Sequence, residues 1–107
     1  MGARPDLQTM KLLQKHLLFI KKKYAPEKIL LFGRRARGDH LEESDIDLIV
    51  VSKKFEGVPF RDRMIEAYGF WNKKNDLEQI CYTPKEFEIK RKQIGIVQQA
   101  VKEGVEL

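Results

Sequence analysis

Cysteine and histidine are scarce in this sequence of 107 residues: Cys81 is its only cysteine, and there are two histidines. A lone cysteine excludes an intramolecular disulfide, and so few Cys and His residues exclude a four-ligand zinc cluster built from them. No apolar run approaches the ~20 residues that a membrane-spanning helix requires, and residues 1–5 lack the apolar stretch of a signal peptide. We therefore expect a cytoplasmic protein that has no membrane partner.

An acidic excess is also absent, because 21 Lys and Arg residues outnumber 16 Asp and Glu residues and give a formal net charge of +5. A positive excess of this size suits a partner that carries phosphate, such as a nucleotide or RNA, and it equally suits an ordinary solvated surface. The sequence has no stripe of arginines with interleaved aromatic residues, so nucleic acid is not the partner that we favour.

Gly and Pro punctuate the chain regularly and no internal repeat is present, which predicts a single domain over residues 1–107. Apolar residues spaced three and four apart predict helices, and short apolar runs predict strands. In chain order the expected elements are a helix over 7–24, strands over 29–32 and 45–52, a helix from Pro59, a strand over 77–82 and a helix from Pro84. This order predicts an α/β (α+β) fold, in which helices flank a small mixed sheet of about three strands.

Several single residues can be assigned within these elements. Thr83 and Glu86 form a capping box at the start of the last helix, where Gly95 predicts a kink or a break. Cys81 is expected to be a buried thiol, and His16, which lies among lysines, is expected on the surface. Alternate residues of the strand 45–52 point to opposite faces, which places Ile46, Leu48 and Val50 on one face and Asp45, Asp47, Ile49 and Val51 on the other.

Two segments carry apolar residues that must pack against another surface. The helix from Pro59 has an inward stripe that consists of Phe60, Met64, Ala67 and Trp71. The C-terminal part of the chain has more apolar residues than one helix face requires, namely Ile94, Ile96, Val97, Val101, Val105 and Leu107. We expect this surplus to contact a partner protein or a second copy of the chain.

The residues that can carry chemistry gather at two places. Asp45 and Asp47 begin a buried strand and share one face of it, about 6.6 Å apart along the strand. Two ionised carboxylates on one face repel each other unless a cation lies between them, and a pair of Mg²⁺ ions is the usual device in phosphoryl transfer. A solvated strand end is the alternative interpretation of the same two aspartates.

The second place is the turn from Gly33 to Gly38, which follows the strand 29–32 directly. A glycine turn that enters a short helix exposes backbone N–H groups, and such groups form a nest for a triphosphate. Arg35 and Arg37 would add positive charge to this nest. An ordinary basic turn is the alternative.

Together, residues 31–39 and 44–50 resemble the minimal nucleotidyltransferases of the polymerase-beta-like superfamily. The signature of this family is Gly-Ser, ten residues and then Asp-x-Asp, and here Gly33 and Arg34 precede ten residues and then Asp45 and Asp47. Segments 55–60, 81–87 and 94–97 also look like small archaeal and bacterial members. The resemblance covers nearly the whole chain and implies a palm-like fold.

The activity that the resemblance implies is transfer of a nucleotidyl group, AMP from ATP, to an acceptor, with release of pyrophosphate. It implies that the nucleotide is bound by Gly33, Arg34, Arg35, Gly38 and Ser44. It implies that two Mg²⁺ ions are held, and catalysis is carried, by Asp45, Asp47 and a third carboxylate on a later strand. The position of Glu78 before Tyr82 makes it the third carboxylate, and Asp76, which has the same strand parity, is the alternative.

One residue departs from the family pattern: Arg34 stands where the family has a serine that helps to hold the triphosphate. An arginine can pair with phosphate in a bidentate manner, or it can fill the pocket and block ATP. Minimal members of the family act with a helical HEPN-type protein as a toxin–antitoxin pair. The resemblance therefore implies an antitoxin that adenylylates its partner, and the alternative is a non-enzymatic module that neutralises a helical partner by contact alone.

Overall fold

The structure is a computed structural model, and it describes residues 5–71 and 73–107. The helices are α1 (Leu7–Tyr24), α2 (Arg34–Arg37), α3 (Phe60–Phe70), α4 (Pro84–Lys90) and α5 (Ile96–Glu103), with a short 3₁₀ turn, η1, at Lys53–Phe55. The strands are β1 (Lys28–Phe32), β2 (Ile46–Val51), β3 (Leu77–Tyr82) and β4 (Val105–Glu106). Within the described ranges, no helix is long and apolar enough to cross a membrane.

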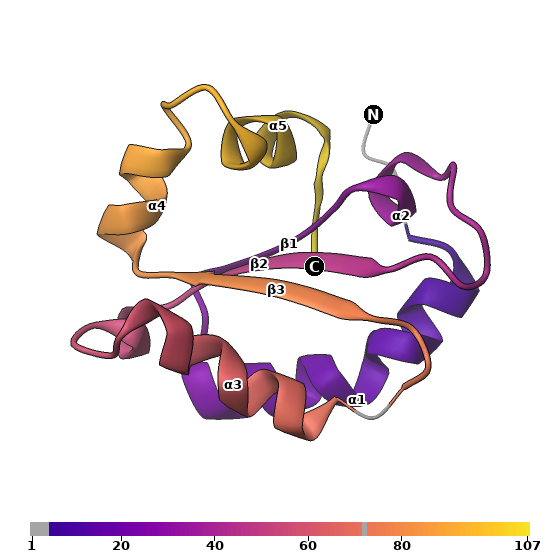
Figure 1. Ribbon diagram of the computed structural model, residues 1–107, viewed down its shortest axis with the longest axis horizontal. Helices are drawn as coiled ribbons and strands as arrows, with labels where there is room; N and C mark the ends of the chain where they lie inside the picture. The colour runs from indigo at the N-terminus through magenta and orange to yellow at the C-terminus, as the bar shows by residue number, and fades with distance from the viewer. Residues whose placement is uncertain (1–4, 72) are drawn as a thin grey trace.

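The strands form one mixed sheet in the order β3-β2-β1-β4 (Figure 1). β1 runs antiparallel to both β2 and β4, whereas β2 and β3 are parallel. The predicted class, a small mixed sheet flanked by helices, is confirmed, and the fourth strand is an addition. β4 has only two residues, too few for any alternating pattern, so the sequence carried no signal for it.

Helices cover both faces of the sheet (Figure 1). α1 and α3 lie on one face, where the core includes Ile46, Leu48 and Val50 of β2. α4 and α5 lie over the other face, where Ile49 and Val51 join a second cluster. The predicted division of β2 into two faces is therefore confirmed, and it sets Asp47 on the side of α4 and α5.

Helix α1 corrects the expectation for His16, which is 1% exposed rather than on the surface. His16 lies three residues after Leu13 and four before Ile20, so it shares the inward stripe of the helix, while the neighbouring lysines point outward. Its Nε2 atom is 2.8 Å from Oε1 of Gln79 on β3. Burial lowers the pKa of His16, so the neutral ring is favoured.

The capping box of the last predicted helix is present: Thr83 and Glu86 exchange hydrogen bonds of 2.9 and 3.2 Å between side chain and backbone. The predicted break is also present, because α4 ends at Lys90 and α5 begins after Gly95. Cys81 is fully buried, as expected. Each of these features follows from interactions within a few residues of sequence, which is why the sequence reveals them.

Helix α3 departs from its predicted stripe at Phe60, which is 45% exposed. Trp71 packs against the core as expected, but α3 also buries Arg63, which the sequence did not suggest. Arg63 donates to both carboxylate oxygens of Glu86, at 2.6 and 3.2 Å, and to the carbonyl of Cys81 at 3.1 Å. A buried arginine satisfied in this way links α3 to β3 and α4.

The C-terminal segment returns to the sheet beside β1. Val105 pairs with Leu31, and Val105 and Leu107 pack against the core, so the structure does not leave these two residues free for a partner. Gly104 makes the return possible, because a Cβ atom there would lie 2.9 Å from the carbonyl oxygen of Leu31. Ile94, in contrast, is 97% exposed.

Candidate active site

The predicted site residues of three strands meet at one end of the sheet. β2 and β3 are parallel, so their first residues lie together, and β1 is antiparallel, so its last residue joins them. In the register of the sheet, Asp47 is paired with Phe32 on one side and with Glu78 on the other. Asp47 and Glu78 therefore lie side by side on neighbouring strands, and Gly33 directly follows Phe32, the partner of Asp47 on β1.

Asp47 is the half-buried member of its carboxylate group, whereas Asp45 and Glu78 are exposed. Burial raises the pKa of Asp47 to about 6, and the negative charges of Glu78 and Asp45 act in the same direction. The positive charge of Arg37 opposes this rise in the pKa. The site thus holds more negative charge than the surrounding side chains neutralise, and a bound cation would restore the balance.

Glu78 and Asp76 were alternatives for the third carboxylate, and the structure favours Glu78. Glu78 lies directly across from Asp47 and is close enough to raise its pKa. Asp76 precedes β3, and its carbonyl accepts a hydrogen bond of 2.8 Å from the amide of Ile46.

The donor chemistry of this group fits Mg²⁺, which prefers carboxylate oxygens. In the described ranges, no three Asp, Glu, His or Cys side chains are arranged as a ready-made metal cage. Mg²⁺ commonly binds through one or two carboxylates together with substrate phosphates. The arrangement therefore fits metal that arrives with a phosphate-bearing substrate better than a resident structural metal.

Gly33 is required at the end of β1 for two reasons. Its φ angle is +76°, a region that residues with a side chain rarely adopt. A Cβ atom at this position would collide with the carboxylate of Asp47, whose Cγ atom would be only 3.2 Å away. The backbone of the turn thus lies directly against Asp47. Gly38, with φ +87°, ends α2 in the left-handed conformation.

Arg35, a predicted nucleotide-binding residue, points away from the carboxylates, and this part of the prediction needs correction. Its side chain is 2% exposed. The guanidinium donates to Thr9 Oγ1 at 2.8 Å, to the Glu42 carbonyl at 2.9 Å and to the Ser44 carbonyl at 3.0 Å. The physical reason is the direction of successive side chains on a helical turn, which sends Arg35 toward α1 and Arg37 to another side.

Arg34 and Ser44, the other predicted nucleotide-binding residues, differ in their surroundings. Arg34 is exposed at the first position of α2. The hydroxyl of Ser44 accepts a hydrogen bond of 2.8 Å from the amide of Leu41, so it folds the loop between the two motifs. The structure thus leaves the Arg34 side chain at the surface of the turn and gives the Ser44 hydroxyl a local partner.

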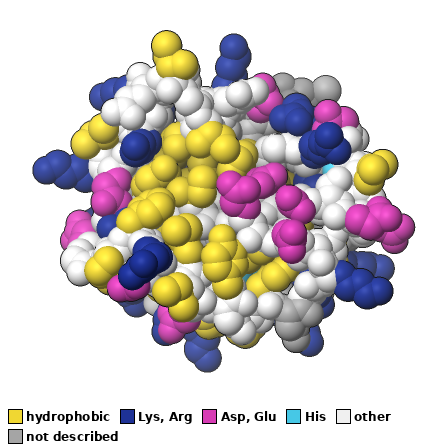
Figure 2. Space-filling view, in the orientation of Figure 1, with side chains coloured by type: hydrophobic (Ala, Val, Ile, Leu, Met, Phe, Trp, Pro, Cys, Tyr) yellow, Lys and Arg dark blue, Asp and Glu magenta, His cyan; other side chains and the backbone are white. Residues whose placement is uncertain are grey.

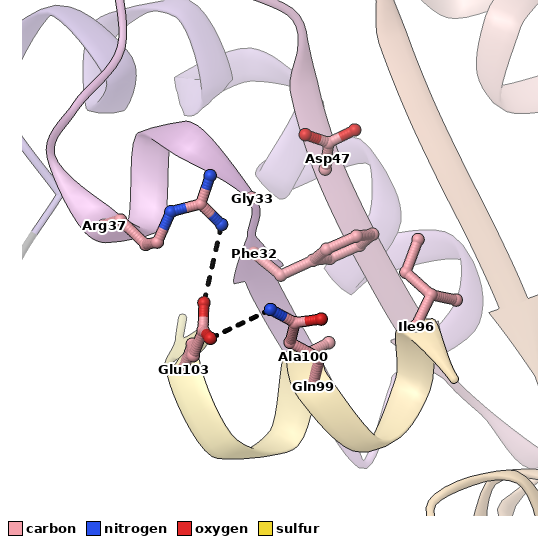
Figure 3. A pocket seen from close by; sticks show the side chains of 8 residues that line it. All are labelled: Phe32, Gly33, Arg37, Asp47, Ile96, Gln99, Ala100 and Glu103. Carbon is pink, nitrogen blue, oxygen red and sulfur yellow. Dashed lines mark hydrogen bonds and ion pairs between the residues drawn. The ribbon is translucent and has the colours of Figure 1, made fainter. Parts of the chain in front are cut away.

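An open cleft of about 220 Å³ lies beside Asp47, between the glycine turn and α5 (Figure 3). It is lined by Phe32, Gly33, Arg37, Asp47, Ile96, Gln99, Ala100 and Glu103. Sequence reasoning noticed Arg37 only as a source of charge and missed the residues of α5, because nothing local indicates that this helix returns to β1. Figure 2 shows acidic side chains gathered beside a broad group of hydrophobic side chains on one face of the molecule.

Comparisons with known proteins agree with this geometry. Residues 13–105 match the family model described as a nucleotidyltransferase domain. Two proteins of Methanocaldococcus jannaschii, both provisionally named protein adenylyltransferases, are 51% and 31% identical to the chain over 39 and 51 residues. These alignments cover 36% and 48% of this chain, and only 39% and 52% of the two relatives.

A crystal structure from Sulfolobus solfataricus, provisionally assigned as a nucleotidyltransferase, has a similar fold. Its TM-score against the chain is 0.65 at 26% identity, and the match covers 92% of this chain and 80% of the other.

Proposed function

The chain belongs to the nucleotidyltransferase domain family, and from this premise we propose that it transfers AMP from ATP to a hydroxyl group of an acceptor protein in a Mg²⁺-dependent reaction. The observation that carries the proposal is the meeting of Gly33, Asp47 and Glu78 at one end of the sheet, where Gly33 and Asp47 line an open cleft. The choice of a protein as the acceptor draws on the names of the two archaeal relatives.

In the proposed reaction, an acceptor oxygen attacks the α-phosphorus of ATP, the bond from that phosphorus to the bridging oxygen of the β-phosphate breaks, and pyrophosphate leaves. Asp45, Asp47 and Glu78 would hold two Mg²⁺ ions, which when bound neutralise phosphate charge and favour the ionised acceptor. The turn at Gly33 brings backbone amides toward the phosphates, and Arg37 supplies a guanidinium at the cleft. Glu78, an exposed carboxylate at the sheet edge, is placed to receive the acceptor's proton.

For the acceptor we propose a helical HEPN-type partner, with the chain as the antitoxin of a toxin–antitoxin pair. The resemblance to minimal nucleotidyltransferases supports this assignment. Ile96, which lines the cleft beside Asp47 and is 52% exposed, offers an apolar side chain next to the reacting groups.

A second candidate is a binding module that neutralises such a partner without chemistry. The observation that favours it is Arg34, which replaces the family serine at the first position of the turn. In this case, ATP would not bind, and removal of the carboxylates would leave neutralisation of the partner intact.

The deciding experiment measures ATP binding by calorimetry with and without Mg²⁺, and transfer of α-labelled AMP to a co-expressed HEPN-type protein. Asp47→Asn should abolish Mg²⁺-dependent ATP binding and AMP transfer, because it removes the charge of the central carboxylate and keeps the shape of the side chain. Glu56→Gln, which changes an exposed carboxylate in the loop after η1, is the matched control and should leave both unchanged. Absence of ATP binding and of label in the unaltered protein, together with intact neutralisation by Asp47→Asn, would establish the binding module instead.

A further inference from the structure

Glu103, at the end of α5, is the acidic residue that faces the predicted phosphate position from the helix side of the cleft. Its Oε1 atom is 3.4 Å from Nη1 of Arg37, and its Oε2 atom accepts a hydrogen bond of 3.0 Å from Gln99 (Figure 3). Gln99 therefore orients the carboxylate while Arg37 pairs with it. Nothing in the reaction described above requires a carboxylate here.

Arg37 is the one cationic residue among the described residues that line the cleft. Its charge reaches Asp47, whose pKa it lowers against the other influences, and its Nε atom lies 3.5 Å from Asp39 Oδ2. The Arg37 side chain is 41% exposed and lines the cleft, so it remains accessible to a ligand. A polyphosphate that entered the cleft would meet Arg37 already engaged by carboxylates.

We propose that Glu103 is a positioning residue that competes with the nucleotide's phosphates for Arg37 and so makes nucleotide binding depend on Mg²⁺. This inference rests on the proposed function. A phosphate chain accepts two parallel hydrogen bonds from a guanidinium and carries more negative charge than one carboxylate, so it displaces Glu103. The displaced carboxylate keeps its hydrogen bond from Gln99 but has lost its counter-charge, so it repels the phosphates.

The dependence on metal follows from charge. Free ATP brings its full negative charge to Glu103 and to the aspartates, whereas ATP bound to Mg²⁺ brings much less. Removal of the Glu103 charge should therefore raise the affinity for free ATP more than the affinity for Mg²⁺-bound ATP. Because Glu103 and Arg37 are partly exposed, the difference between the effects on free and on Mg²⁺-bound ATP should shrink as added salt screens the charges.

Calorimetric titration of ATP and of inorganic tripolyphosphate into four proteins tests this inference: the unaltered chain, Glu103→Gln, Arg37→Gln and the double variant. Glu103→Gln keeps the hydrogen bond from Gln99 and should bind both ligands about three- to fivefold more tightly without Mg²⁺, from the strength of partly exposed ion pairs. With Mg²⁺ the gain should fall below about twofold. In the Arg37→Gln background the gain should also fall below about twofold, since the competition acts through Arg37.

Glu106→Gln is the matched control, because Glu106 lies on β4 in an exposed pair with Lys28, at 3.4 Å, outside the cleft. Unchanged or weaker ligand binding by Glu103→Gln would overturn the inference. It would also be overturned if the gain in affinity persisted in the double variant, or if the gain were the same with Mg²⁺ as without it. If no protein binds either ligand, the inference and the nucleotide site both fail. If tripolyphosphate binding shows the expected pattern while AMP transfer is absent, only the proposed function fails.

Discussion

Replacement of Asp47 by asparagine should stabilise the folded protein in the absence of metal. Asp47 is half-buried, and burial together with the charges of Glu78 and Asp45 raises its pKa from 3.8 to about 6. A carboxyl group with a raised pKa destabilises the fold whenever it is ionised, because the unfolded chain accepts the charge more readily. Asparagine has the same shape and no charge, so it removes this cost.

The size of this stabilisation follows from the shift in the pKa of Asp47. A difference of about two pH units corresponds to about 3 kcal/mol at pH 7, and relaxation around a half-buried group reduces the expected gain to about 1–2 kcal/mol. The cost is complete above the folded pKa of about 6 and is relieved as pH falls toward the unfolded value of about 4. The advantage of Asp47→Asn should therefore be full at pH 7.5 and absent near pH 4.

Thermal and urea unfolding at a series of pH values measure this difference. At pH 7.5 without Mg²⁺, the melting temperature of Asp47→Asn should exceed that of the unaltered protein by about 4–10 °C. Addition of Mg²⁺ with ATP should raise the melting temperature of the unaltered protein and leave that of the variant where it was. Glu56→Gln should change neither quantity. A variant that is no more stable than the parent at pH 7.5, or whose advantage is the same at pH 4, would refute the reasoning.

Four further substitutions test the supports of the site and of the fold around it. Arg35→Gln should destabilise the protein by about 2–4 kcal/mol in urea unfolding, because it removes a buried guanidinium that donates to Thr9 and to the carbonyls of Glu42 and Ser44. Gly33→Ala and Gly57→Ala both place a side chain at positive φ, but only Gly33→Ala meets a carboxylate, so it should lose ATP affinity at least tenfold while Gly57→Ala retains it. The pKa of Glu86 is lowered to about 2, chiefly by its hydrogen bonds from Arg63. Above pH 5 the ionised carboxylate should therefore stabilise the fold by about 1–2 kcal/mol, a figure discounted for its partial exposure. This stabilisation should be lost as pH falls toward 2. The stability of Glu86→Gln should therefore match that of the unaltered protein only in strong acid.

Local rules account for most of the fold that the sequence predicts. Alternation along 45–52 predicts which residues of β2 face α1 and which face α5, and the structure agrees. The capping box at Thr83 and the break at Gly95 are likewise contained within a few residues. The contact of the Gly33 turn with Asp47, in contrast, joins the end of β1 to β2 and is not contained in the local sequence.

The remaining features depend on contacts between distant segments. His16 lies on the inward stripe of α1, and only the tertiary structure supplies the polar partner of its buried ring, Gln79, far along the chain. The different fates of Arg35 and Arg37, two residues apart on one short helix, are decided by what lies on each side: α1 and the loop for Arg35, α5 for Arg37. A motif predicts that basic residues belong near the carboxylates, but only tertiary structure determines which one can reach a ligand.

The distribution of charge at this end of the sheet argues for a bound cation and an anionic ligand together. The chain as a whole is basic, yet Asp45 and Glu78 lie close enough to Asp47 to raise its pKa. Asp47 lines a cleft in which Arg37 is the counter-charge, and Glu103 already engages Arg37. Stability alone would favour neutral side chains at these positions, since the raised pKa of Asp47 shows that its charge is costly. In the function that we propose, Mg²⁺ would relieve the repulsion among the carboxylates, and phosphates that arrive with it would draw Arg37 away from Glu103. The two ligands should therefore assist each other's binding, and neither should bind well alone.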